Sequence, residues 1–149
     1  MRRVLGILLA LAAPVLTGPE NSSVTLWVQL VHATRGDSVQ FAGWKSIGPE
    51  LNKRLSDVFR WSDYYEVSRK EVAIEPGKIT KIRLLGERDV AITFKSPTEM
   101  EVRLYRDGRL VRTAQRSLKQ RMTIMGGDSN QNQKEAWFVV VRRDKPQDK

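Results

Sequence analysis

The stretch Met100–Arg121, MEVRLYRDGRLVRTAQRSLKQR, is the part of the chain that most constrains its fold. Apolar and polar residues alternate on both sides of Asp107-Gly108, a dipeptide that can supply the two positive φ angles of a tight hairpin turn. The pattern therefore predicts two antiparallel strands joined by this turn.

The predicted hairpin is strongly basic, with seven basic residues and one acid between Arg103 and Arg121. A two-residue loop would place Arg106 opposite Arg109 and Arg103 opposite Arg112. Directly opposed like charges destabilise a sheet by a few tenths to ~1 kcal/mol, so we expect either solvent screening or an anionic partner. Arginine suits phosphate and carboxylate recognition because its guanidinium is a bidentate fork. The predicted anion- or partner-binding residues are Arg103, Tyr105, Arg106, Arg109, Arg112 and Arg116.

The second half of the hairpin fits two secondary structures. Val111 and Thr113 favour a strand through about Ala114. Apolar residues also recur there at helical spacing, namely Leu110, Ala114, Leu118 and Met122. Whether residues 114–122 form strand or helix stays open at this point.

In most of the remaining chain apolar and polar residues alternate with a period of two, and in one segment the apolar residues recur at helical spacing. Tyr65 and Val67 differ in phase from Val72 and Ile74, which predicts a β-bulge near Ser68–Lys70. The predicted strands are Val24–Ala33, Tyr64–Ile74, Thr80–Leu85, Val90–Lys95, Met122–Met125 and Ala136–Val141, with an exposed loop at Gly126–Glu135. The last strand is apolar on both faces, which is typical of a central strand covered on both sides.

The helix is predicted over Pro49–Arg60, with Pro49 at its first position and Gly48 at the cap. Its apolar stripe consists of Ile47, Leu51, Leu55, Val58 and Phe59. The expected fold is therefore α+β, an antiparallel β-sheet of six to eight strands packed on one main helix. The alternative is a β-sandwich or open β-barrel with one helix.

The N-terminus has the layout of a secretory signal peptide, because Arg2-Arg3 precede the apolar run Val4–Leu16. The run is short for a membrane span, which needs about 20 residues. Residues 1–17 are the predicted signal peptide, with an uncleaved N-terminal anchor as the alternative. Residues 18–149 form one predicted domain whose tail frays from about residue 142.

The residue types present argue against several classes of site. The chain has no cysteine, which excludes disulfides and thiolate metal ligands. His32 is the one histidine, and we interpret it as a structural imidazole. No metal site, cofactor or catalytic residue is predicted, and a small hydrolase is the least favoured hypothesis.

The hypothesis that unites these observations is an exported, non-enzymatic binding protein of a bacterial envelope, periplasmic or secreted. It would face an anionic polymer or a membrane surface through the arginine-rich hairpin. The alternative is a structural or assembly module that pairs with a protein partner and uses its basic face only for solubility. Nucleic acid is not an expected partner, because the leader directs export and the interleaved stacking aromatics of a single-strand binder are lacking.

Overall fold

The computed structural model describes residues 22–35, 43–129 and 134–147. The predicted signal peptide lies outside these ranges. The described elements are nine strands and one helix: β1 (Val24–Thr34), β2 (Lys45–Ser46), α1 (Pro49–Val58), β3 (Asp63–Ile74), β4 (Ile79–Arg83), β5 (Arg88–Ser96), β6 (Glu99–Arg106), β7 (Arg109–Ser117), β8 (Met122–Ser129) and β9 (Glu135–Arg142).

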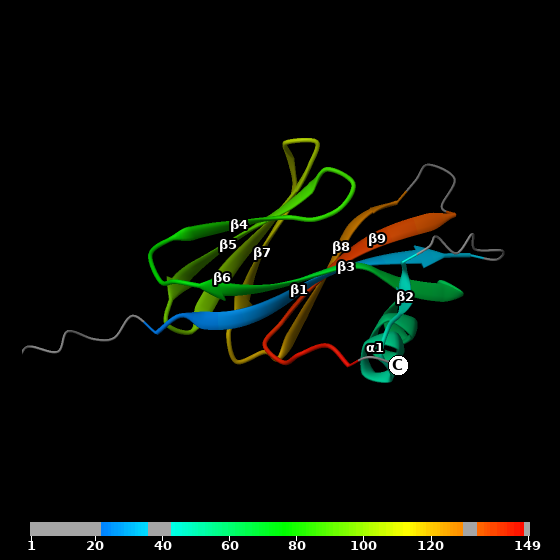
Figure 1. Cartoon of the computed structure of the whole chain (residues 1–149), viewed down its shortest axis with the longest axis horizontal. Coiled ribbons are helices and arrows are strands. Elements are labelled where there is room, and N and C mark those ends of the chain that lie inside the picture. Colours follow the sequence, from blue (N-terminus) through cyan, green and yellow to red (C-terminus); the bar gives the residue numbers. More distant parts are fainter. Residues whose placement is uncertain (1–21, 36–42, 130–133, 148–149) are drawn as a thin grey trace, which may run out of the picture.

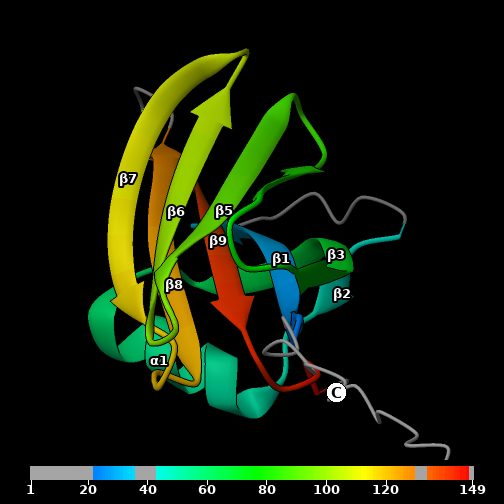
Figure 2. The ribbon, with the colours of Figure 1, turned by 90° about the vertical axis from the view of Figure 1, so that its left-hand side faces the viewer.

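The strands form two antiparallel sheets that face each other (Figures 1 and 2). Sheet A has the order β2-β3-β1-β9-β8, and sheet B has the order β4-β5-β6-β7. The predicted antiparallel β-rich fold with one helix is confirmed. Its strands are divided between two sheets, the arrangement of the sandwich alternative, rather than gathered in one.

The main core lies between the two sheets. Alternate residues of β1 point into it, and Leu26, Val28 and Leu30 are all at most 1% exposed. They meet alternate residues of sheet B, among them Val90, Ile92, Met100, Val102 and Leu104. The period-two pattern of the sequence therefore corresponds to this interface.

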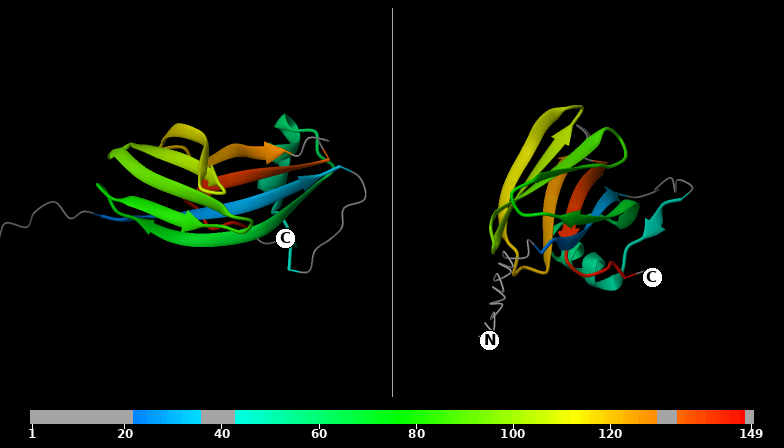
Figure 3. Two further views of the ribbon diagram at one scale, coloured as in Figure 1. Left: turned by 90° about the horizontal axis from the view of Figure 1, so that it is seen from above. Right: turned by 60° about the vertical axis from the view of Figure 1, so that its left-hand side comes forward.

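A second core lies between sheet A and α1, which packs on the face of sheet A that points away from sheet B (Figure 3). Leu51 and Leu55 of the helix are buried there against Phe138 and Val140 of β9. On its other face β9 contributes Val139 and Val141 to the main core. The prediction of a final strand covered on both sides is thus confirmed.

The helix begins at Pro49 as predicted and ends at Val58, two residues early. Val58 is 71% exposed, so its assignment to the apolar stripe is wrong. Phe59 already has extended backbone, and its N–H donates to the Leu55 carbonyl. Lys53 and Asp57 form an i,i+4 ion pair of 2.6 Å on the exposed side.

A β-bulge interrupts β3 close to the predicted place. Leu30 of β1 faces Ser68, while Val31 faces Glu66, which leaves Val67 as the extra residue. The change of phase seen in the sequence results from this inserted residue.

The hairpin has the predicted turn, since φ is +51° at Asp107 and +75° at Gly108. Strand β7 continues to Ser117, so the helical alternative for its second half is wrong. Arg106 lies opposite Arg109 as predicted.

The predicted pairing of Arg103 with Arg112 is wrong. Tyr105 faces Leu110 but Leu104 faces Arg112, so Val111 is an extra residue in β7. This bulge shifts every later pair by one residue, and Arg103 lies opposite Thr113 instead.

The C-terminal region is more regular than expected. Strand β8 runs four residues beyond the predicted Met125. We expected fraying from about residue 142, but Arg142 is the last residue of β9 and is only 3% exposed. Its Nε donates to Asp144 at 3.2 Å, and Pro146 is buried. The chain therefore stays on the body of the protein through at least Pro146.

Candidate functional site

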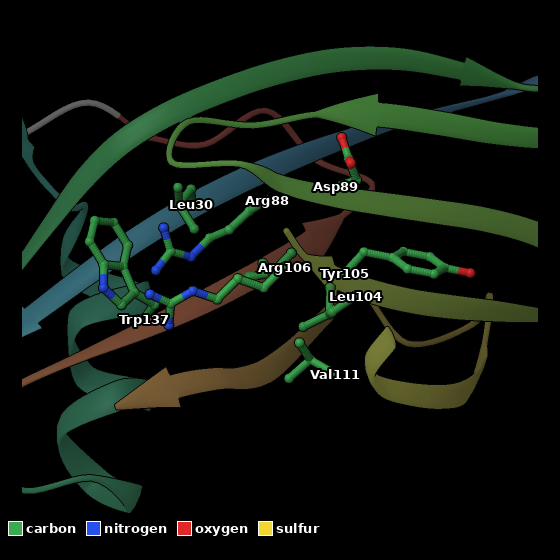
Figure 4. A pocket seen from close by; sticks show the side chains of 9 residues that line it. Leu30, Arg88, Asp89, Leu104, Tyr105, Arg106, Val111 and Trp137 are labelled. Carbon is green, nitrogen blue, oxygen red and sulfur yellow. The ribbon is translucent and has the colours of Figure 1, made fainter. Parts of the chain in front are cut away.

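The six predicted binding residues do not form one surface. Met100, Val102 and Leu104 of β6 point into the core, so the residues between them point outward from sheet B. Arg103 and Tyr105 thus lie on the outer face. Arg106, two residues after Leu104, lies on the inner face (Figure 4).

The outer face of sheet B is an ion-paired network. The Arg103 Nε lies 2.8 Å from Glu101, and Lys95 lies 3.7 Å from the same carboxylate. Glu101 is only 7% exposed because these cations cover it. Next to this group Arg83 pairs with Asp89, and Lys81 lies 5.5 Å from the Tyr105 ring centroid. The cations of this face are largely neutralised by carboxylates of the same sheet.

Strand β7 carries the second set of arginines. It is an edge strand of sheet B and is exposed along nearly its whole length. In the described ranges no carboxylate lies within ion-pair distance of Arg109, Arg112 or Arg116. Arg112 faces inward beside Leu104 and extends toward Gly126 of β8. This edge is therefore a row of cations without local carboxylate partners.

A third group of arginines lies in a cleft between the two sheets. Arg88 of β5 and Arg106 of β6 are directly opposite each other, and both point to Trp137 of sheet A (Figure 4). The cleft is shallow and partly open to solvent. Its apolar walls are Leu30, Leu104, Val111 and Val139.

Arg88 is held firmly in this cleft. It is 9% exposed, and its Cζ lies 4.1 Å from the Trp137 ring centroid. Its Nη1 donates to the Gly86 carbonyl at 3.2 Å. Burial lowers the pKa of Arg88, and the charge of Arg106 lowers it further. The charges of Asp107 and Glu135 act in the opposite direction.

Sequence reasoning missed Arg88 and Trp137 as candidate site residues. Residues 86–89 fall between the predicted strands Thr80–Leu85 and Val90–Lys95, and Trp137 was one of several apolar residues in the last strand. The pairing of β5 with β6 across the Ser96–Glu99 turn was the available signal, because counting back along it places Arg88 opposite Arg106.

Behind Trp137 lies an aromatic cluster that contains His32. The imidazole is 4.4 Å from the Trp137 ring and 4.8 Å from the Trp44 ring, between centroids. Its Nε2 lies 2.9 Å from a carboxylate oxygen of Glu135, and the residue is 3% exposed. These contacts fit the interpretation of His32 as a packed structural residue that supports the cleft wall.

The described residues contain neither a cluster of metal-binding side chains nor a helix long and apolar enough to cross a membrane. No group of three or more histidine, aspartate or glutamate side chains is arranged to hold a metal ion there. Within the same ranges no helix is long and apolar enough to cross a membrane. Comparison with protein-family models, curated proteins and solved structures finds no match for the chain.

Proposed function

We propose that this chain is a non-enzymatic binding protein of a bacterial envelope that contacts an anionic polymer or lipid surface through its arginine-rich hairpin. The observation that carries the proposal is the exposed row Arg109, Arg112 and Arg116, with no carboxylate in ion-pair range among the described residues. The proposal excludes Arg103 from the contact, because Glu101 already holds it.

Long-range charge supports the same function. The chain has a formal net charge of +9, so an anionic surface attracts it and salt weakens the attraction. A bulge and an inward-pointing charge are devices that prevent an edge strand from pairing with another chain. Strand β7 has both, at Val111 and Arg112, which favours anion contact over the alternative of strand pairing with a protein partner.

Salt-dependent retention on an anionic polymer column tests the proposal. We expect Arg112→Glu with Arg116→Glu to elute at clearly lower salt than the parent protein. The matched control is Arg60→Glu with Lys70→Glu, which makes the same charge change at exposed residues outside sheet B. Equal losses of retention in both double variants would show that only net charge matters, and the proposal would then be wrong.

A further inference from the structure

We infer that the cleft between Arg88, Arg106 and Trp137 is a binding site for the terminal carboxylate or phosphate of an amphipathic molecule. The inference rests on the proposed function in that the ligand is anionic. It goes further because it names a pocket in the protein and a ligand with a charged end and an apolar portion. The exposed β7 edge alone does not indicate either.

The placement of the two cations favours an anion between them. Arg88 and Arg106 occupy directly opposed positions on neighbouring strands, and both point into the same cleft. Like charges in this arrangement destabilise a sheet. Here one of the two is also 9% exposed, so solvent screens it poorly. An oxyanion between the guanidiniums would offset both costs.

Arg88 is fixed in place without a ligand. Its guanidinium packs on Trp137 and donates to the Gly86 carbonyl. The Asp107 N–H donates to the Glu87 carbonyl at 3.0 Å, which joins the two turns that carry the arginines. A preorganised donor loses little conformational freedom on binding, and this favours affinity.

The remaining walls of the cleft are largely apolar. Leu30, Leu104 and Val139 line the interior of the cleft. Val111, the bulged residue of β7, also lines it and remains 44% exposed. Pockets that combine apolar walls with a few convergent polar groups are typical of small-molecule sites. A short alkyl chain can therefore cover Val111 while its charged end lies at the arginines.

Carboxylates near the cleft reduce the positive charge of its arginines. Asp107 lies 3.8 Å from the Arg106 Nε, and Glu135 lies beside His32. Asp89 pairs with Arg83 and points away from the cleft (Figure 4). The charges of both Asp107 and Glu135 reach Arg88. Asp107 is 67% exposed, so water screens its attraction for the arginines.

Isothermal titration calorimetry on the full chain tests the inference with octyl phosphate, octanoate, inorganic phosphate and neutral octyl glucoside. We expect saturable binding of octyl phosphate and octanoate at least ten-fold tighter than that of phosphate, and none of octyl glucoside. Equal affinity for phosphate and octyl phosphate would identify a free-ion site and overturn the amphipathic ligand. The absence of saturable binding by any probe would overturn the site itself.

Arg106→Gln locates the site, because Arg106 is exposed and its loss leaves the core intact. We expect at least a ten-fold loss of octyl phosphate affinity, whereas Lys119→Gln, at an exposed residue outside both the cleft and the β7 row, leaves it unchanged. If Arg106→Gln has no effect while the β7 variants still lose polymer retention, the cleft is wrong and the proposed function stands. If Arg106→Gln abolishes octyl phosphate binding but the β7 variants keep their retention, the cleft stands and the β7 contact is wrong.

Discussion

Arg103 and Arg106 lie three residues apart on β6, yet their side chains leave opposite faces of the sheet. Arg103 meets Glu101 and becomes part of a structural ion network, while Arg106 meets Arg88 in a cleft. Identical residue types in one basic stretch therefore have different roles. What decides the role of each is the charged residue that it meets, which is Glu101 on the same strand for Arg103 and Arg88 on the neighbouring strand for Arg106.

The pair Arg142–Asp144 gives a pH-dependent prediction. Hydrogen bonding to Arg142 lowers the pKa of Asp144. The contribution of this carboxylate to stability is therefore complete above its unfolded pKa of about 3.9, and it is lost as pH falls through the lower folded value. We expect Asp144→Asn to lower the free energy of unfolding at pH 7 by about 1 kcal/mol, a modest value because water screens the 38%-exposed carboxylate.

Urea unfolding of the parent and of Asp144→Asn at several pH values measures this effect. The difference between them should shrink below about pH 4 as the parent carboxyl becomes protonated. Asp57→Asn is the control, because the exposed pair with Lys53 should contribute less than about 0.5 kcal/mol. A difference for Asp144→Asn that is the same at pH 7 and pH 2 would contradict the account.

At the scale of elements, the sequence allowed the strands, the helix start and the hairpin turn to be predicted because each has a local pattern. The β3 bulge was also visible, since Val67 shifts the apolar phase of its strand. The β7 bulge was not visible, because β7 buries little and its apolar phase carries no information. The unpredicted bulge at Val111 shifts the register by one residue, and Arg103 therefore does not pair with Arg112.

Two glycines should respond differently to replacement by alanine, because of the two only Gly108 of the hairpin turn has a positive φ angle. Gly108→Ala forces an alanine into φ +75°, and we expect a loss of about 1–2 kcal/mol in the free energy of unfolding. Gly126 has no such φ, and an added Cβ would meet its nearest atoms at 3.9 Å, an ordinary contact. Gly126→Ala in β8 should therefore be neutral or stabilising by up to about 1 kcal/mol. Chemical denaturation would contradict this if both variants lost equal stability.

The corrected helix stripe gives a further prediction for α1. Leu55 is fully buried between the helix and sheet A, so Leu55→Ala should cost about 2–5 kcal/mol. Val58 is 71% exposed, so Val58→Ala should stay within about 0.5 kcal/mol. Comparable losses for the two variants in urea unfolding would mean that the helix ends later and buries Val58.

At the scale of the whole molecule, two sheets and a helix make two cores that share sheet A. Because the last strand is apolar on both faces, the sequence indicated that β9 would contact two cores. It did not reveal which face of sheet B would meet sheet A. The cleft depends on that packing, since Arg88 comes from sheet B and Trp137 from sheet A. The contact of Trp137 with the arginine pair could not be predicted from local patterns, because Trp137 is distant in sequence and meets the arginines only in the assembled sandwich.

The most direct test of the account follows the arginine side-chain Nε–H resonances by NMR while octyl phosphate is added. The account predicts the largest chemical shift changes at Arg88 and Arg106 of the cleft. It predicts little change at Arg83 and Arg103, which carboxylates of the outer face already hold. Changes at Arg83 and Arg103 as large as those in the cleft would contradict the central claim that the inner arginines receive the anion.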